Sequence, residues 1–345
     1  MVNSVYTNLP STKYKLIKNP IKKQNVPYKP KKCIGLLLNL LTKVMVAKSK
    51  KPSIMDGYSK RDNTNYSHGY MASNGYSGVD ITSLNPGTYN LFVKLEKDGY
   101  GNKIILGYDQ NRAGLQEWVD EMYRDDKSSN YFDGTAIHWY ESTYDFFPEA
   151  LQYAHNKAPN KYLIETEGCV DSEIPKWQDD DWYWSKEATD WGWDWASEKD
   201  KHLHPKYAPV NRYVRDIIGC LNNWVDGWVD WNMVLDTQGG PNWFKNWCVA
   251  PIIVDPEKDE VYFTPIYYTM AHFSKYIRPQ AEIIEVKKSD KDLMVTAAKN
   301  TDGSIAVVIF NEGTTQKSFQ LSLGEEVTTI SINAQAIQTI LINTI

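Results

Sequence analysis

Residues 161–169 read KYLIETEGC, a short apolar run that ends in carboxylates. The apolar part, Tyr162 to Ile164, is typical of a strand buried in a sheet. Two acidic side chains, Glu165 and Glu167, come next, and Gly168 then lets the backbone turn away. Strict strand alternation would place both carboxylates on the same side, so we expect Glu165 to be buried and to need a partner of its own.

Similar strands lie on both sides of this stretch, and a helical pattern follows each of them. Apolar side chains recur at helical spacing, as at Leu115, Trp118, Val119 and Met122, and Pro148 is typical of a helix's first turn. Four strand-then-helix units in succession predict parallel strands with helical crossovers. The expected strands are KIILGY (103–108), GTAIHWY (134–140), KYLIETEGC (161–169) and VDGWVDWNMVL (225–235), and the expected helices are 113–123, 148–157, 210–221 and 267–276.

The pattern changes after Pro279 to short β runs at close spacing with turn signals between them. These runs predict an antiparallel β-sandwich, with a domain break near residue 280. The preceding sheet could be a β/α barrel or an open doubly wound sheet, and the lack of a Gly-rich phosphate loop favours the barrel. A full barrel has eight strand–helix units, and we count four. We therefore expect an α/β fold in three parts: a leader (1–93), the C-terminal half of a (β/α)8 TIM barrel (94–279) and a sandwich (280–345).

The charge of the chain is divided unevenly. The first 55 residues hold twelve Lys and no acidic residue, so they predict either a disordered or poorly packed tail or an arm that binds anions. The other 290 residues hold 26 basic and all 43 acidic residues, which does not suit general nucleic-acid binding. No apolar run is long enough to span a bilayer, and no convincing secretory signal is visible.

Metal and disulfide signals are weak. The four Cys show no CxxC spacing, so buried free thiols are expected rather than disulfides or a metal site. No HExxH and no clustered carboxylate set occurs, so we expect neither a metal nor a cofactor.

Polar and aromatic residues gather where the expected strands end, which is how a β/α barrel builds a site. Carboxylates among Trp and Tyr suit a sugar, because aromatic faces pack on pyranose rings while carboxylates bond the hydroxyls. All 13 Trp lie between Trp118 and Trp247. The acidic, Trp-rich segment 177–195 is either a set of outer sugar subsites or a packed surface loop. From the pattern alone, Glu167 is equally well a catalytic or a structural carboxylate.

Residues from about 94 onward resemble the C-terminal portion of glycoside hydrolase family 30, which includes glucosylceramidases and β-1,6-glucanases. This resemblance implies a β/α barrel with an attached sandwich, a retaining mechanism, and a carbohydrate or glycolipid substrate. The matching stretches, in family order, are GYDQNR, IHWY, ETEGCV, WVDWNMVLDTQGGPNW, APIIVD and FTPIYYTMAHFSKYIRP.

The resemblance also implies roles for individual residues. Glu167 corresponds to the nucleophile, with Tyr140 beside it, while Trp231 shapes the sugar subsite and Asn246 lines it. Asp109 and Gln110 match the family less specifically. Trp139 and His138 are either part of the sugar site or simply packed and hydrogen-bonded, and Trp228 is expected in the core. Substrate-binding residues are therefore Tyr140, Trp231, Asn246, Asp109, Gln110 and Trp139.

One family feature is missing. The family's acid/base is a Glu in an Asn-Glu-Pro stretch, and no such stretch occurs in these 345 residues. Asn311-Glu312 falls in the expected sandwich and cannot replace it. We therefore expect slow hydrolysis of ordinary glucosides and a truncated barrel. The alternative is a non-catalytic remnant or carbohydrate-binding module that keeps the aromatic platform. Localisation and oligomeric state stay open.

Overall fold

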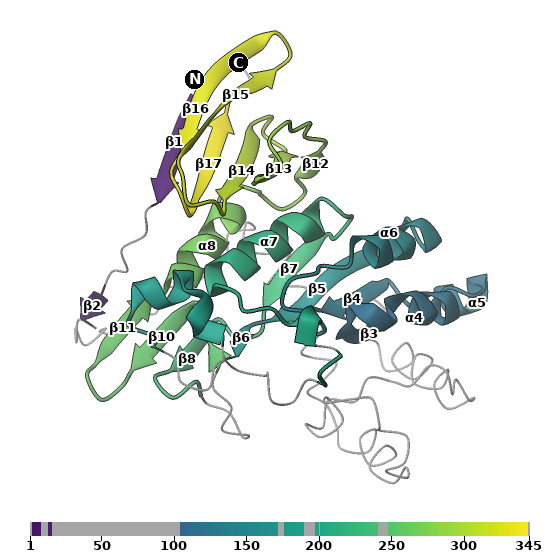
Figure 1. The fold of residues 1–345 in the computed structure, drawn as a ribbon. Helices are drawn as coiled ribbons and strands as arrows, with labels where there is room; N and C mark the ends of the chain where they lie inside the picture. The colour runs from purple at the N-terminus through teal and green to yellow at the C-terminus, as the bar shows by residue number, and fades with distance from the viewer. Residues whose placement is uncertain are drawn as a thin grey trace, which may run out of the picture.

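Figure 1 shows a parallel sheet with its helices, a smaller mixed sheet beside it, and a β-sandwich packed over helices α7 and α8. The structure is a computed structural model. It describes residues 2–7, 13–15, 104–171, 176–189, 197–199, 201–240 and 248–343.

The parallel sheet has the strand order β3-β4-β5-β7, and every neighbouring pair is parallel. This confirms the strand-then-helix interpretation, with two changes of boundary. The first strand begins three residues later than KIILGY, and the stretch 225–235 divides into two strands in different sheets. The bounds are β3 Leu106–Asn111, β4 Gly134–His138, β5 Tyr162–Gly168, β7 Gly227–Asp230 and β8 Val234–Asp236.

The four expected helices are confirmed, and in three of them a proline stands in the first turn. Proline suits that position because its missing N–H has no intrahelical partner there anyway. The bounds are α4 Leu115–Met122, α6 Pro148–Lys157, α7 Pro209–Leu221 and α8 Pro265–Ser274. Shorter helices are η6 Arg112–Gly114, α5 Asp126–Ser129, η7 Asp180–Trp184, η8 Lys186–Thr189 and η9 Lys201–Leu203.

Beside the parallel sheet, β8 runs parallel to β10, and a hairpin joins β10 to β11. This places the end of VDGWVDWNMVL in a separate sheet from its beginning. A two-stranded ladder pairs β6, which follows β5 of the parallel sheet, with β9, which precedes β10 of the mixed sheet and carries Cys248. The bounds are β6 Val170–Asp171, β9 Cys248–Val249, β10 Ile252–Asp255 and β11 Glu260–Phe263.

The sandwich is antiparallel throughout, as expected after Pro279. A five-stranded sheet of order β1-β17-β14-β13-β12 faces the hairpin β15–β16 across an aliphatic core that includes Ile309, Ile332 and Ile340. The other face of the sheet contributes Val308, Phe310 and Ile337 to the core under α7 and α8. The bounds are β12 Glu282–Ile284, β13 Leu293–Lys299, β14 Ile305–Asn311, β15 Lys317–Leu323, β16 Glu326–Ile332 and β17 Ala336–Ile342.

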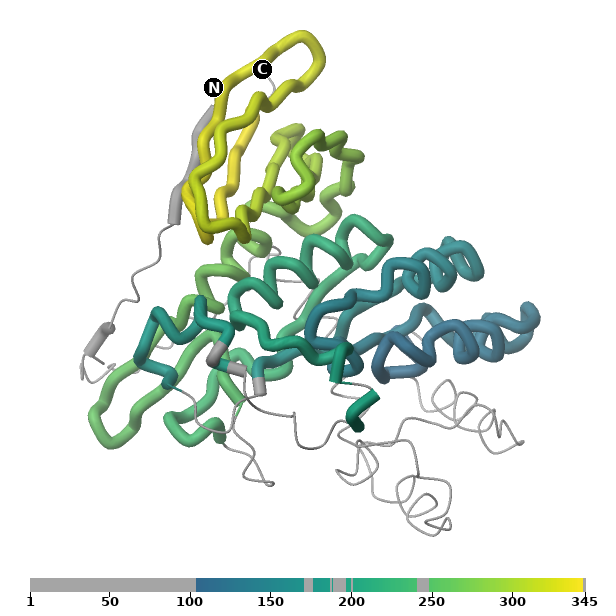
Figure 2. Tube along the Cα trace, in the orientation of Figure 1, coloured from purple at the N-terminus to yellow at the C-terminus, as the bar shows by residue number. Residues whose placement is uncertain are grey.

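Two short strands come from the Lys-rich leader. β1 (Val2–Thr7) pairs with β17 at the edge of the sandwich, and β2 (Lys13–Lys15) pairs with β11. The two ends of the chain therefore lie side by side (Figures 1 and 2). The remaining leader up to residue 93 lies outside the described residues, so the expectation for it stays a prediction.

The buried His272 joins the helical layer to the sandwich. Its Nδ1 lies 2.8 Å from the Thr339 hydroxyl on β17, and its side chain is shielded from water. Burial lowers the pKa of His272 from 6.5 to about 4, because the charged imidazolium loses its hydration. The unfolded chain then binds a proton more readily than the folded one between these two pH values. This contact therefore stabilises the fold above pH 6.5 and weakens it as the pH falls toward 4.

Replacing His272 by Asn, which can keep a hydrogen bond to Thr339, is expected to reduce this acid sensitivity. The pKa difference corresponds to about 3 kcal/mol lost from the free energy of unfolding between pH 6.5 and 4. Urea unfolding followed by circular dichroism at several pH values measures it. The exposed His202, changed to Asn, is the control. An equal acid sensitivity in wild type and His272→Asn would contradict the assignment.

Candidate active site

The parallel strands lose their regular register at one end of the sheet. The ladder shifts between Tyr108 and Gln110 in β3, between Ile137 and His138 in β4, and between Glu165 and Gly168 in β5. Such irregularities bend a strand and re-aim its side chains, and they gather next to active sites. All three lie at the carboxyl ends of their strands, where a β/α barrel carries its functional groups.

The irregularity in β3 places two bulky residues in an unusual backbone conformation. Tyr108 has φ 76° and Asp109 has φ 59°, a region that residues other than glycine seldom adopt. The surrounding contacts hold this turn, because the Tyr108 hydroxyl donates to the Asn111 carbonyl and the Tyr108 ring packs on Trp118 at 5.3 Å. Strain of this kind persists where the structure needs a side chain in a fixed place, which here is Asp109.

Asp109 links three neighbouring strands through its carboxylate. Its Oδ1 lies 3.0 Å from His138 Nε2 and accepts a hydrogen bond of 3.0 Å from the Thr166 hydroxyl. A second carboxylate oxygen, Glu167 Oε2, lies 3.8 Å from the same Nε2. The imidazole is fully buried, whereas the Asp109 side chain is 42% exposed and that of Glu167 is 13% exposed. The two carboxylates thus reach solvent above a buried histidine.

Glu165 takes a different partner from Glu167. Its Oε2 accepts a hydrogen bond of 2.8 Å from Arg112 Nη2, and neither side chain is accessible to water. The expectation that Glu165 is buried with its own partner is confirmed. The register between β4 and β5 shifts between the two glutamates, so Glu167 stands opposite His138 while Glu165 pairs with Arg112 in the core.

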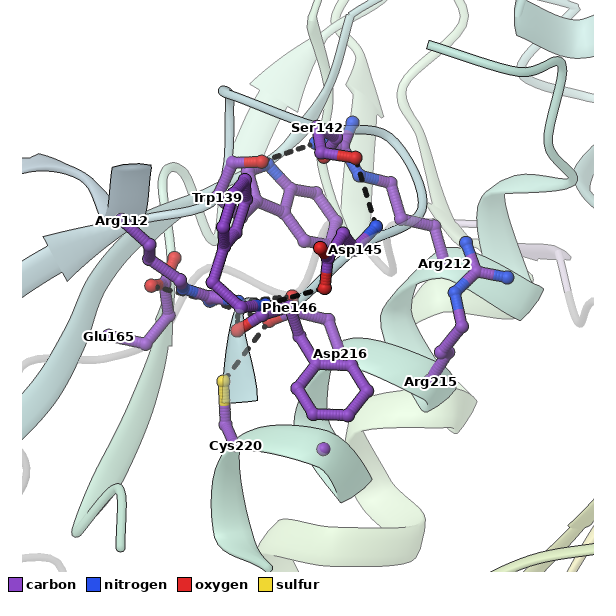
Figure 3. Close-up of polar contacts among 12 residues, drawn as sticks. Arg112, Trp139, Ser142, Asp145, Phe146, Glu165, Arg212, Arg215, Asp216 and Cys220 are labelled. Atoms are coloured by element: carbon purple, nitrogen blue, oxygen red, sulfur yellow. Dashed lines mark hydrogen bonds and ion pairs between the residues drawn. The ribbon is translucent and has the colours of Figure 1, made fainter. Parts of the chain in front are cut away.

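Arg112 is held from its other side by Asp216 on α7, as Figure 3 shows. The guanidinium makes two hydrogen bonds to this carboxylate, of 2.7 and 2.9 Å. Trp228 Nε1 and the Cys220 thiol also donate to Asp216 Oδ1, at 2.8 and 3.4 Å. The planar fork of arginine suits this geometry, since two parallel N–H bonds match one carboxylate.

The two carboxylates around Arg112 differ in their affinity for a proton. Burial raises the pKa of Glu165 well above its usual value, against the attraction of Arg112. Burial also opposes the ionisation of Asp216, but the Arg112 guanidinium holds its pKa below the usual value. Burial thus favours the neutral form of Glu165, whereas Arg112 favours the charged form of Asp216.

Aromatic residues divide between the core and the site. Trp139 is 2% exposed and packs edge-on against Tyr213 and Trp228, with the Arg212 guanidinium 3.9 Å from its ring centroid. This placement favours the packed alternative for Trp139. Trp228 is buried too, which confirms its expected core position.

Tyr140 and Trp231 lie together on a second cluster near Glu167. Both pack against the buried residues around Cys169, Leu235 and Cys248. The Tyr140 hydroxyl is 3.5 Å from the Cys169 sulfur, and the backbone N–H of Trp231 donates to the Gly168 carbonyl at 2.8 Å. The two residues that follow Glu167 are therefore tied to the two aromatic residues expected to bind sugar.

The other expected site residues have simpler positions. Gln110 follows Asp109 and accepts a hydrogen bond of 2.9 Å from the backbone N–H of Asn111. Asn111 in turn accepts one of 2.9 Å from the Tyr140 backbone N–H. Asn246, with most of the GGPNW stretch, lies outside the described residues. The structure thus brings together Asp109, Gln110, Glu167, Tyr140 and Trp231.

Several contributors were missed by sequence reasoning. Thr166 and Asn111 lie inside stretches that the sequence singled out. The hydrogen bond from Thr166 to Asp109, and the one that Asn111 accepts from the Tyr140 backbone, depend on the irregular register. Asp216 left a detectable signal, because it is a carboxylate within an otherwise apolar helix face that includes Tyr213 and Ile217. Such a residue is seldom buried unless it is paired.

Other features of the described residues bear on the class of protein. Cys169, Cys220 and Cys248 are free and buried, as expected for these three thiols. In the described part of the chain, no group of three or more His, Cys, Asp or Glu could hold a metal ion. Among the same residues, no helix is long and apolar enough to cross a membrane. Glu312, in the sandwich, pairs with Asn211 and Arg215 of α7, at 3.2 and 3.8 Å.

Parallel strands that carry carboxylates and aromatics at their carboxyl ends, followed by an antiparallel sandwich, define a β/α-barrel protein with an attached β-sandwich. Residues 91–277 match the glycosyl hydrolase family 30 TIM-barrel domain, and residues 280–340 match the family's β-sandwich domain. The chain belongs to glycosyl hydrolase family 30.

Relatives and solved structures agree with this membership. The chain is 34% identical to putative glucosylceramidase 4 of Caenorhabditis elegans over 61% of this chain and 36% of the relative. It is 33% identical to lysosomal acid glucosylceramidase of Mus musculus over 60% of this chain and 36% of the relative. SrfJ from Salmonella typhimurium shares the fold with a TM-score of 0.61 and 25% identity, covering 74% of this chain and 50% of SrfJ.

The endo-β1,6-glucanase BT3312 has the same fold, with a TM-score of 0.56 and 22% identity over 73% of this chain and 50% of BT3312. The chain therefore spans about a third of the length of the curated relatives it matches, and half the length of these structures.

Replacing Arg112 by Met is expected to destabilise the fold strongly, because it leaves two carboxylates buried without a cation. Breaking a buried pair in this way typically costs about 3–5 kcal/mol. Chemical unfolding followed by tryptophan fluorescence measures the loss. Arg124→Met is the matched control, since Arg124 pairs with Glu121 at the exposed surface, where ion pairs contribute less than about 1 kcal/mol. Equal losses in the two variants would contradict the central role of Arg112.

The carboxyl of Asp230, at the end of β7, provides a second pH-dependent effect. Burial raises its pKa to about 7, against a hydrogen bond of 2.7 Å from the Tyr213 hydroxyl. The folded state then holds a proton that the unfolded state has lost. This group stabilises the fold most below about pH 4, and that contribution disappears as the pH rises through 7.

Asp230→Asn is therefore expected to gain stability relative to wild type as the pH rises from 5 to 8. Thermal unfolding at fixed ionic strength measures the difference, and Asp126→Asn on the exposed α5 is the control. A constant difference between Asp230→Asn and wild type over this range would show that Asp230 has an ordinary pKa.

Proposed function

We propose that this chain carries the nucleophile half of a retaining glycoside hydrolase that acts on β-glucosidic bonds, with Glu167 as the nucleophile. The observation that carries the proposal is the position of Glu167. It stands at the carboxyl end of a parallel strand, is partly exposed, and has His138 at 3.8 Å. Family membership supports glycoside hydrolysis as the class of reaction.

The surroundings of Glu167 suit attack on an anomeric carbon. The carboxylate would bond the sugar directly, since retaining enzymes form a covalent glycosyl intermediate. His138, itself fixed by Asp109, would orient the Glu167 oxygen that is not attacking. Tyr140 and Trp231 would bind the pyranose ring, together with Asn246. Asp109 and Gln110 would meet sugar hydroxyls, and Trp139, packed edge-on against Tyr213, would support the site from the core side.

The Asn-Glu-Pro stretch that holds the family's acid/base does not occur in the 345 residues of this sequence. A general acid typically contributes a factor of about 10² to 10⁴ in rate by protonating the leaving oxygen. Good leaving groups need no such proton. We therefore propose that the chain reacts with activated glucosides and only very slowly with ordinary ones.

The proposed domain boundaries divide the chain into three parts. We propose the boundaries 94–279 for the barrel part and 280–345 for the sandwich, behind a separate leader of residues 1–93. The family matches at 91–277 and 280–340 support a break near 280. The substrate would be a glucosylceramide or a β-1,6-glucan. The identity with glucosylceramidases supports the first, and the absence of a long apolar stretch in the sequence favours the second.

The proposal is tested with 2-deoxy-2-fluoro-β-glucosyl fluoride, whose leaving group departs without acid. Fluorine at position 2 slows hydrolysis of the intermediate, so the sugar is expected to remain on Glu167. Mass spectrometry of the tryptic peptide 162–176 would locate it. Glu167→Gln should abolish labelling, and the exposed Glu117→Gln should not change it.

The missing acid favours a second candidate, a non-catalytic carbohydrate-binding remnant. Binding of gentiobiose or glucosylceramide without any covalent trapping would support this candidate against the enzyme. Turnover of an ordinary aryl glucoside at the rate of a complete family member would contradict the proposed loss of acid catalysis.

A further inference from the structure

A second surface of the molecule, away from Glu167, combines amides with exposed aromatic rings. It is a shallow cavity of about 430 Å³ on the outer side of the helical layer, between α4, α6 and the end of α7. In Figure 1 the helices α4 and α6 lie side by side. The side chains that line it and carry the argument are Gln116, Glu149, Gln152, Tyr153, Asn156 and Asn223.

The chemistry of this lining points to an uncharged ligand with many hydroxyls. Four amides offer both donors and acceptors, and one carboxylate adds strong acceptors. No Lys or Arg lines the cavity, so it does not suit a phosphate or another anion. Its volume falls within the range of about 300–1,000 Å³ that small-molecule sites usually have.

Trp224 stands beside this cavity, directly after Asn223, and is 53% exposed. Its Nε1 donates to Gln152 Oε1 at 2.9 Å. The imidazole of His155 stacks on one face of its indole, with ring centroids 3.9 Å apart and an interplanar angle of 0°. A large aromatic ring that is supported from one side and open to water elsewhere is a suitable platform for a pyranose ring.

The backbone at Trp224 is held in a rare conformation. Its φ of 69° lies in the left-handed region, which is unfavourable for a bulky residue. Stability alone would favour glycine at this position. A tryptophan kept exposed at such a position is therefore better explained by a binding role than by packing.

The side chains around the platform are already fixed. Gln152 also donates to Asn156 Oδ1 at 3.0 Å, and Asn223 donates to the Gly219 carbonyl at 2.8 Å. The Tyr153 hydroxyl donates to the Asp120 carboxylate, with both oxygens within 2.9 Å. A surface organised before the ligand arrives loses less entropy on binding.

We propose that this surface is a second carbohydrate-binding site that takes a neutral oligosaccharide, with Trp224 as its main contact. Trp224 precedes the amino end of β7, whereas Glu167 lies near the carboxyl end of β5 and Trp231 directly follows β7. Trp224 and the proposed nucleophile are therefore at opposite ends of the parallel sheet. Such a site would hold a glycan chain on the protein whether or not Glu167 is catalytic.

The test is binding of gentiotetraose to the full chain, measured by isothermal titration calorimetry, in wild type and in Trp224→Gly. Glycine relieves the left-handed strain, so this variant is expected to fold at least as stably as wild type while its affinity falls about tenfold or more. A tenfold change corresponds to about 1.4 kcal/mol, within reach of one lost aromatic contact.

Two further variants separate this site from the proposed active site. Trp231→Ala should keep the Trp224-dependent binding, and Tyr144→Ala, which removes an exposed ring outside the cavity, should not change it. Unchanged affinity in Trp224→Gly, or a complete loss of binding in Trp231→Ala, would overturn the proposal. The absence of any saturable oligosaccharide binding in wild type would overturn it as well.

Discussion

The ion cluster around Arg112 connects the elements on which the rest of the structure depends. Arg112 follows β3, Glu165 lies in β5, and Asp216 lies on α7. One guanidinium therefore connects two strands of the parallel sheet to the helix that covers it (Figure 3). The cluster is dry, and each carboxylate would be costly to bury alone. Its geometry therefore fixes how far β3 and β5 stand apart and how α7 is rotated above them.

The candidate active site begins directly above this cluster. Glu167 lies two residues beyond Glu165, and Asp109 three residues before Arg112, so both site carboxylates extend from strands that the cluster holds. The register of these strands shifts at Asp109 and after Glu165, next to the two site carboxylates. The charged cluster thus restrains the strands at the places where their register is irregular.

Helix α7, which carries Asp216, also links the parallel sheet to the sandwich. It is buried on nearly all sides, because the parallel sheet lies under it and the sandwich lies over it. Asn211 and Arg215 reach Glu312 in the sandwich, while Arg212 reaches the Trp139 carbonyl and the Trp139 ring. The same helix thus connects the sandwich to the strand ends of the parallel sheet.

Periodicity alone determined the four strand–helix units, the sandwich after Pro279 and the carboxylates at the strand ends, because each depends on local spacing that a chain keeps when it folds. The stretch KYLIETEGC also indicated both glutamates. Only the tertiary structure decided that Arg112 is the partner of the buried Glu165, because these residues lie 53 positions apart and meet only when the strands pack side by side. It likewise decided that Asp216, distant in sequence, neutralises Arg112, since pairing between residues 104 positions apart depends on how sheet and helix pack.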